Sequence, residues 1–236
     1  LYHYKPLKDA LTSSPLNPIS LEKQKKDTLA PNDYGQVIHK LLENINRTLT
    51  SPTAETITQV IGHFTTKKST IKHTQDLVNA SINRYQNSNY FKDLATMSHT
   101  PEMPFSFTYK TLTIEGRYDL VIHPESGPHI IDFKTNQQFP EDSEISTAYT
   151  TQMTIYLMAL SQRYPQYDTL SATLYFTEFG QSHTIQKSKT DLQEFQKQLD
   201  AIIDSIQTQS FTAPDKSVCE NCVLYKVNPT CPENKL

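Results

Sequence analysis

Two short segments of the sequence place charged side chains among strand-forming residues. Asp119 precedes the apolar run Leu120-Val-Ile122, and Asp132 and Lys134 are two residues apart in Ile-Ile-Asp-Phe-Lys. Alternate side chains of a strand share a face, so Asp132 and Lys134 point the same way and the apolar residues beside them point the other way. A carboxylate and an amine are costly to bury unless they are paired or used. We therefore interpret both segments as neighbouring strands that carry a functional site.

The chemistry that these residue types favour is metal-assisted hydrolysis of a phosphate ester. Asp119 and Asp132 on adjacent strands could hold Mg²⁺ or Mn²⁺, hard cations that prefer oxygen ligands. The metal would polarise a phosphate oxygen and make a bound water more nucleophilic. Lys134 could position that water or stabilise the developing charge. The alternative is that the acids end their strands in solvent and Lys134 forms an ordinary salt bridge. Two matched segments weaken that alternative.

Three further side chains lie on predicted helices. Gln152 and Tyr156 are four residues apart, so they share a helix face that could contact a DNA backbone or the edge of the site. His39 follows Gly35 by one turn beside an apolar stripe, and a neutral imidazole could complete the metal shell. The alternatives are a partly buried polar edge for Gln152 and Tyr156, and a packed histidine for His39.

The elements that must position these residues follow from hydrophobic periodicity and turn signals. Ser51 and Pro52 are expected to cap and begin the second helix, and Asp191 to cap the last one. Residues 87–101 read as a short helix or loop. Helices are predicted over 33–49, 51–64, 70–86, 145–163 and 191–207, and strands over 102–109, 111–123, 129–136, 170–177 and 182–186.

This order of elements predicts an α/β fold with a mixed central sheet flanked by helices. We expect residues 1–30 to form a linker or N-terminal arm and residues 31–208 to form the core. Within the core, residues 31–100 should be helical, and 101–208 should hold the sheet and its flanking helices. Residues 209–236, which contain all three cysteines, are expected to form a separate tail.

Composition and charge limit the partners and the location that we expect for the protein. The net charge of −3 gives no basic signature, so a nucleic-acid partner would be held by a local patch or by another domain. No apolar run approaches the roughly 20 residues that span a membrane, and the first twenty residues lack a signal-peptide pattern. The few, late cysteines predict a reducing, cytoplasmic location. The start at Leu1 rather than Met predicts a domain cut from a longer chain.

Taken together, four motifs resemble the RecB-type branch of the PD-(D/E)XK nucleases. They are Gly35-x-x-x-His39, Gly116-x-x-Asp119, Asp132-Phe-Lys134 and Gln152-x-x-x-Tyr156. The resemblance implies a restriction-endonuclease-like fold, with His39, Asp119 and Asp132 as ligands of Mg²⁺ or Mn²⁺. It implies that Asp119, Asp132 and Lys134 are catalytic and that Gln152 and Tyr156 are accessory or contact DNA. Glu102, in Glu-Met-Pro-Phe, resembles a residue that supports the site, and we do not expect it to be a ligand.

The same resemblance implies a metal-dependent deoxyribonuclease, an exonuclease within a helicase–nuclease that repairs double-strand breaks by recombination. A helicase domain in the same longer chain would feed single-stranded or unwound DNA to the site, and a partner subunit would complete the assembly. The main alternative is an inactive nuclease-like domain that binds DNA or braces a helicase subunit. A second alternative is a sequence-specific restriction-type endonuclease.

Cys219, Cys222 and Cys231 resemble the C-terminal part of an iron–sulfur staple that some of these nucleases carry. That staple needs a fourth cysteine upstream of the histidine helix, and residues 1–38 contain none. We therefore expect no iron–sulfur cluster in this fragment. A ligand in removed sequence, a zinc site and a relic of the staple remain open as explanations of the three cysteines.

Overall fold

The structure, a computed structural model, describes residues 27–136, 138–140 and 142–208. Its centre is a five-stranded sheet in the order β1-β2-β3-β4-β5. Only β3 and β4 are parallel, and α6 provides the crossover that a parallel pair requires. The mixed sheet confirms the predicted α/β class. The strands are β1 (Ser98–Tyr109), β2 (Leu112–His123), β3 (His129–Lys134), β4 (Thr169–Phe176) and β5 (Gln181–Ser188).

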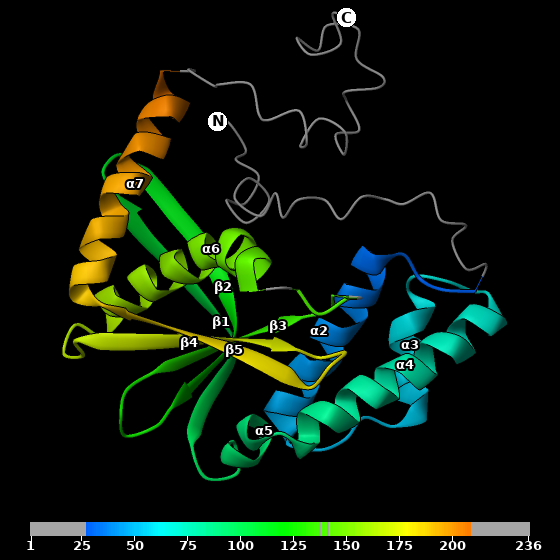
Figure 1. Cartoon of the computed structure of the whole chain (residues 1–236). Coiled ribbons are helices and arrows are strands. Elements are labelled where there is room, and N and C mark those ends of the chain that lie inside the picture. The colour runs from blue at the N-terminus through cyan, green and yellow to red at the C-terminus, as the bar shows by residue number, and fades with distance from the viewer. Residues whose placement is uncertain (1–26, 137, 141, 209–236) are drawn as a thin grey trace, which may run out of the picture.

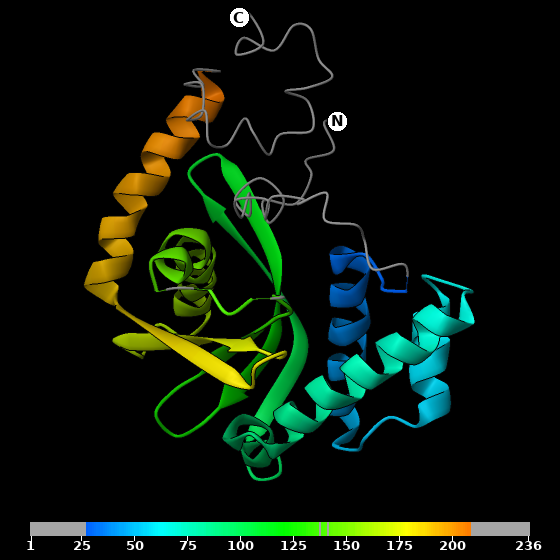
Figure 2. The same cartoon turned by 45° about the vertical axis from the view of Figure 1, so that its right-hand side comes forward.

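Helices cover both faces of this sheet (Figures 1 and 2). The N-terminal helices α2 (Pro31–Thr48), α3 (Ala54–Gly62), α4 (Lys68–Asn87) and α5 (Asn89–Asp93) lie on one side. The other side carries α6 (Asp142–Arg163) and α7 (Lys189–Gln207). The chain therefore folds its helical first part against a sheet that the later part builds.

The predicted N-caps of two helices are wrong, and side-chain hydrogen bonds show which residues cap them. The N-cap of α3 is Thr53, whose hydroxyl accepts a hydrogen bond from the Thr56 amide, so Ser51 and Pro52 precede the helix. Asp191 is not the cap of α7. Ser188 accepts a hydrogen bond from the Asp191 amide, and the Asp191 carboxylate accepts one from the Ser188 amide. This reciprocal pair is a capping box with aspartate in place of glutamate.

Strand pairing also shifts the predicted limits of the sheet. β1 begins at Ser98, not at 102, because residues 98–101 pair with the far end of β2. The segment 87–101 is thus divided between α5 and the start of β1. β3 ends at Lys134, two residues before the predicted end at 136. Beyond it, the Asn136 side chain donates a hydrogen bond to the Tyr149 hydroxyl of α6 at 2.9 Å. Long-range contacts decided these boundaries, so a local pattern could not predict them.

The two faces of β3 separate the hydrophobic core into two clusters. Ile131 and Phe133 lie in the cluster packed under α2–α5, whereas Ile130 lies in the cluster under α6 and α7. Strand alternation predicts that Asp132 and Lys134 lie on the same side as Ile130. Their contacts agree, since Lys134 pairs with Asp132 and hydrogen-bonds to Gln152 of α6. The charged pair is therefore held on the face that α6 covers.

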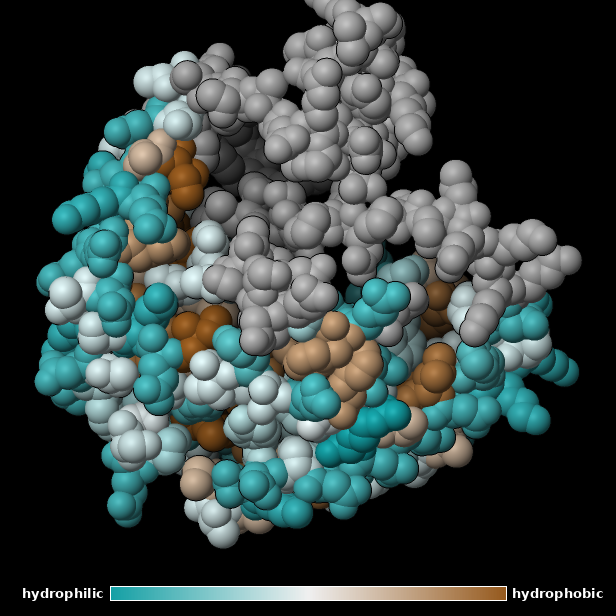
Figure 3. Space-filling view, in the orientation of Figure 1, coloured by the Kyte–Doolittle hydropathy of each residue, from teal (hydrophilic) through white to brown (hydrophobic). Residues whose placement is uncertain are grey.

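Several expectations fall outside the described residues, namely the N-terminal arm up to residue 26 and the cysteines of the tail. None of the helices that the structure describes combines the length and the apolarity needed to cross a membrane. Figure 3 shows a largely hydrophilic face with hydrophobic residues in limited patches. Among the described residues, the large hydrophobic side chains that remain exposed are Leu49, Leu77 and Phe139.

One buried histidine makes the stability of this sheet sensitive to acid. His129 Nδ1 lies 2.5 Å from Ser171 Oγ, and its Nε2 lies 2.9 Å from Thr173 Oγ1. Burial lowers the pKa of His129 from 6.5 to about 4, because the charged imidazolium would lose its hydration. The unfolded chain therefore takes up a proton at His129 at a higher pH than the folded chain does.

We predict that this difference destabilises the fold as the pH falls from about 6.5 to about 4. The folded pKa is depressed, so the unfolded state binds more protons in that window, and His129 alone accounts for a loss of up to about 3 kcal/mol. Urea unfolding measured across this pH range should give a shallower loss for His129→Asn than for the wild type. His73→Asn, at an exposed position on α4, should keep the wild-type slope. Equal slopes for all three proteins would contradict the prediction.

Candidate active site

The site lies where β2 and β3 part. The two strands pair at Leu120–Ile131, Val121–Ile130 and Ile122–His129, and the pairing ends at Leu120–Ile131. Asp119 and Asp132 are the next residues on each strand. The Asp119 Oδ2 atom accepts a hydrogen bond from the Phe133 amide at 2.8 Å, so its carboxylate fills the opening between the strands. This bond satisfies a backbone donor that the missing pairing would otherwise leave without a partner.

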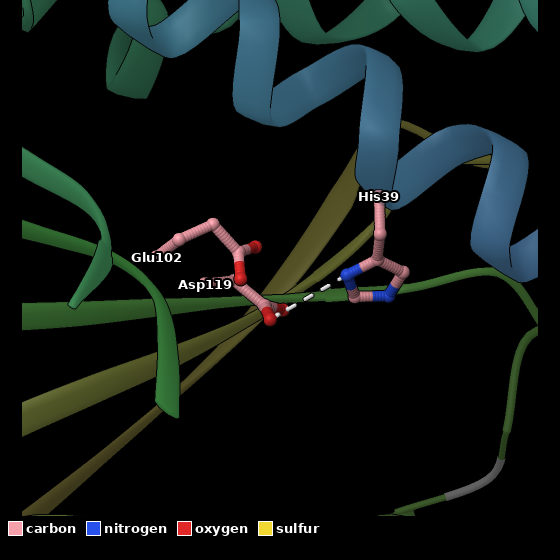
Figure 4. A group of neighbouring side chains, drawn as sticks. All are labelled: His39, Glu102 and Asp119. Carbon is pink, nitrogen blue, oxygen red and sulfur yellow. Dashed lines mark ion pairs between the residues drawn. The ribbon is translucent and has the colours of Figure 1, made fainter. Parts of the chain in front are cut away.

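Three side chains from three elements converge on the α2 side of this opening (Figure 4). One ligand atom from each of His39, Glu102 and Asp119 lies within 4.8 Å of the others. His39 comes from α2, and its Nδ1 atom is 3.4 Å from Asp119 Oδ1. The ring edge of Phe133 contacts His39 and helps to orient it. One imidazole and two carboxylates fit a divalent cation such as Mn²⁺ or Mg²⁺.

Glu102 reaches the group through a local distortion of the β1–β2 hairpin. The two strands pair from Ser98 to Tyr109 with one interruption, at Glu102 and Asp119. Glu102 has a φ of 52°, a left-handed conformation that costs energy for a residue other than glycine. Such strain at a cluster of acids is a typical feature of functional sites. We expected Glu102 only to support the site, yet it lies among the atoms that could bind the metal.

The pKa of Glu102 reflects this crowding. Its side chain is 18% exposed. Burial, followed by the nearby Asp119 carboxylate, raises the pKa of Glu102, while a hydrogen bond from Arg117 lowers it to a smaller extent. The folded protein without metal therefore disfavours the ionised form of Glu102. A bound divalent cation would reverse that preference, because it places positive charge between the two carboxylates.

Asp132, which we expected to be a ligand, lies beside Lys134 instead of within the group of three. Lys134 Nζ is 2.7 Å from Asp132 Oδ2, and Asp132 is only 1% exposed. Burial lowers the pKa of Lys134, but the charge and the hydrogen bond of the Asp132 carboxylate, together with Asp119 and Tyr149, outweigh burial. The net pKa is raised, so Lys134 carries its proton at neutral pH. The ring of Tyr149, whose centroid is 4.8 Å from Nζ, covers the ammonium.

Gln152 and Tyr156 of α6 hold the lysine in place. Lys134 Nζ donates a hydrogen bond to Gln152 Oε1 at 3.1 Å, and Gln152 Nε2 donates to the Tyr156 hydroxyl at 3.0 Å. Both side chains are 5% exposed. Burial, with the two aspartates adding to it, raises the pKa of Tyr156 and keeps its hydroxyl neutral. The shared helix face predicted from the sequence thus points at the site, and its burial leaves little area for DNA.

Two glycines allow the elements around the site to approach closely. A Cβ atom on Gly35 would lie 3.2 Å from Thr135 Oγ1, so a larger residue would push α2 away from the end of β3. A Cβ atom on Gly116 would lie 2.4 Å from the ring of Phe105, which packs against Tyr118. Both positions keep a ligand-bearing element close to its neighbour, since His39 follows Gly35 and Asp119 follows Gly116.

The six side chains proposed from sequence thus form two adjoining groups. His39 and Asp119 join Glu102 on the α2 side, and Asp132, Lys134, Gln152 and Tyr156 form a chain of contacts that leads to α6. The sequence did not predict that Glu102 would lie in this group. The only available signal was its place in Glu-Met-Pro-Phe, because the left-handed turn that aims it appears only in the folded chain.

Comparisons with known proteins show the superfamily and the fold of the chain. A sequence model of the PD-(D/E)XK nuclease superfamily matches residues 17–232. No curated protein matches this chain. Among solved structures, a protein from Eubacterium rectale provisionally described as an exonuclease is similar in fold, with 13% identity and a TM-score of 0.52. The alignment covers 84% of this chain and 75% of that one. The protein SSO0001 aligns over 97% of this chain and 98% of its own, at 13% identity and a TM-score of 0.37.

We predict that Glu102→Gln weakens Mn²⁺ binding by more than about tenfold, or about 1.4 kcal/mol, in calorimetric titrations. Without metal, the same change should raise the melting temperature by a few degrees. It removes a carboxylate that the fold disfavours in its ionised form, and about 1 kcal/mol shifts the melting temperature of a domain of this size by about 2–4 °C.

Glu115→Gln provides the matched control, since Glu115 is an exposed glutamate on the same hairpin. It should leave both metal binding and the melting temperature close to the wild type. The opposite result would be wild-type Mn²⁺ affinity in Glu102→Gln and loss of binding in Asp132→Asn. It would favour His39, Asp119 and Asp132 as the ligands, as the sequence suggested.

Proposed function

Because this chain belongs to the PD-(D/E)XK nuclease superfamily, we propose that it is a metal-dependent deoxyribonuclease that hydrolyses phosphodiester bonds. The observation that carries the proposal is the placement of a three-residue ligand group beside a buried, protonated lysine. Either feature alone has structural explanations. Their juxtaposition at the opening between β2 and β3 supplies both parts that phosphate-ester hydrolysis requires.

His39, Glu102 and Asp119 would hold Mg²⁺ or Mn²⁺. When bound, the metal would polarise a phosphate oxygen and lower the pKa of a water that attacks the phosphorus. The imidazole is neutral when it serves as a ligand, so binding should weaken in acid. Asp132 remains a candidate ligand, as the resemblance implies, if a change of rotamer carries its carboxylate from Lys134 to the metal.

Lys134 acts as a fixed positive charge rather than as a base. Its raised pKa keeps the ammonium protonated, so it cannot take a proton from water at neutral pH. It can donate hydrogen bonds to a phosphate oxygen or to the attacking water, and stabilise the negative charge that develops during attack. Asp132 and Gln152 hold it in one position beforehand, which removes the cost of ordering it during the reaction. Tyr156 in turn holds Gln152.

We predict that Lys134→Gln and Asp119→Asn each lower the rate of DNA cleavage by at least about a hundredfold, the range seen when one electrostatic contact is removed. Removal of the metal by EDTA should abolish cleavage, and Mn²⁺ or Mg²⁺ should restore it. The assay measures product release from labelled single-stranded and double-stranded DNA. Lys187→Gln, on the distant edge strand β5, is the control and should cut like the wild type.

Lys134→Gln needs a control for folding, because the Asp132–Lys134 pair is buried. Removing one partner leaves a buried charge without its counterion, which costs about 3–5 kcal/mol. Melting curves must therefore show that each variant is folded. Cleavage that survives in both folded variants would contradict the proposal. Absence of both Mn²⁺ binding and cleavage in the wild type would favour the alternative of an inactive DNA-binding or scaffolding domain.

We further propose that the enzyme is an exonuclease that acts on free DNA ends. The resemblance to RecB-type nucleases supports this proposal, while the restriction-type alternative predicts cutting within the strand. The same assay separates them, because an exonuclease degrades linear DNA and spares a closed circle of the same sequence. Cleavage of both at equal rates would favour an endonuclease.

The biological setting that we propose is a cytoplasmic helicase–nuclease that processes double-strand breaks. The net charge of −3 supports an outside source of DNA affinity, such as a motor domain of the same longer chain or a partner subunit. The complete reading frame tests this proposal. A frame without a motor domain, and with no motor gene beside it, would contradict it.

A further inference from the structure

A groove adjoins the metal group on the side away from Lys134. Its volume is about 590 Å³, within the range of pockets that bind small molecules. His39 and Glu102 line both the groove and the metal group, so the two are continuous. The other walls come from α2, from the end of α3 and from Arg117 on β2. Asp132, Lys134 and Gln152 do not line it, and the catalytic role proposed above does not use it.

The wall at the end of α3 presents an ordered aromatic ring. Phe64 follows α3 by two residues and is half-buried against the cluster under α2–α5. The turn that carries it is hydrogen-bonded, with the Phe64 amide donating to the Ile61 carbonyl at 2.9 Å and the Thr65 amide donating to the same carbonyl at 3.3 Å. Exposed His63 lies beside it on the groove. A ring held in this way can stack on a base without first being ordered.

The remaining walls favour an anion. Lys40 and Arg117 line the groove from opposite elements, together with the acids Glu43 and Glu102. Glu43 pairs with Lys40 at 3.0 Å and also with Arg47 at 3.1 Å. Arg47 does not line the groove, but with it the three side chains carry one positive charge in excess beside the groove. Arg117 lies 3.4 Å from Glu102, which a bound metal would engage. With metal present, the groove therefore has a net positive potential.

We propose that this groove binds one unpaired nucleotide of the DNA strand, next to the phosphate that is cut. Its base stacks on Phe64, and its phosphate pairs with Arg117 and Lys40. A base within a duplex is already stacked on both faces and paired, so it must leave the helix before it can reach the ring. The groove would thus bind a base of the single-stranded or unwound DNA that the resemblance implies as the substrate. This inference rests on the proposed nuclease function and names the residues that hold the nucleotide next to the cut.

The chain offers a direct reporter, because it contains no tryptophan. Phe64→Trp keeps an aromatic ring in the groove and introduces the only indole. Phe91→Trp is the matched control, since Phe91 on α5 is also half-buried against the same cluster but does not line the groove. Both changes are made in the full chain with Lys134→Gln, which keeps the proposed metal ligands and slows cutting. The probe is twelve-residue oligothymidine with Mg²⁺, and indole fluorescence is recorded.

We expect saturable quenching of the indole by the oligonucleotide in Phe64→Trp and none in Phe91→Trp. Phe64→Ala should weaken binding of the oligonucleotide by about 5- to 100-fold, the range for loss of one stacked base, whereas Phe91→Ala should change it less than about twofold.

Arg117→Gln should reduce the salt dependence of binding by about one phosphate contact, and Lys92→Gln on α5 should not. A blunt hairpin of the same length should bind more weakly than the single strand and give less quenching.

Several outcomes would overturn the inference. Absence of quenching in a folded Phe64→Trp protein that binds the oligonucleotide would show that no base reaches the ring. Equal quenching and affinity for the blunt hairpin would contradict binding of an unpaired nucleotide. These results leave the nuclease proposal standing as long as the wild type cuts DNA. A wild type that binds Mn²⁺ but neither binds nor cuts either substrate would refute both.

Discussion

The hydrogen bond between the Asp119 carboxylate and the Phe133 amide is the contact on which the site depends. The pairing of β2 with β3 ends at Leu120–Ile131, just before Asp119 and Asp132. The side-chain bond at 2.8 Å takes the place of the backbone contact that is missing there. It fixes one oxygen of Asp119, so the other can face His39 at 3.4 Å. The alternation of side chains along β3 places Asp132 on the opposite side, against Lys134. One local break in the sheet therefore lies between the ligand group around Asp119 and the ion pair of Asp132 and Lys134.

Each group is supported by the layer of helices nearest to it. On one face, α2 supplies His39 and packs closely because Gly35 leaves room for Thr135. On the other face, α6 supplies Gln152 and Tyr156, which reach Lys134 through two successive hydrogen bonds. A chemical site built on rigid elements and backed by buried partners keeps its geometry without ligand. The helices on the two faces of the sheet thus serve the site directly, since each face provides one half of it.

Several features of this site raise the free energy of the folded chain when no metal is bound. Glu102 adopts a left-handed backbone conformation and carries a raised pKa beside Asp119, and both features disfavour the folded chain without metal. Asp132 and Lys134 lose hydration on burial, and their pairing offsets part of that cost. Metal and phosphate charges would relieve these costs in the bound state. Stability and activity are therefore expected to oppose each other at Glu102, where removal of the charge stabilises the chain.

The sequence by itself determined the order of elements, the alternation that puts Asp132 and Lys134 on one face, and the helical spacing of Gln152 and Tyr156, because all three follow from local periodicity. The superfamily was also recognisable from four short motifs. Only the tertiary structure decided that Glu102 joins His39 and Asp119 while Asp132 turns to Lys134. That choice depends on where β2 leaves β3 and on one unusual backbone angle, and both arise from contacts between residues far apart in the chain.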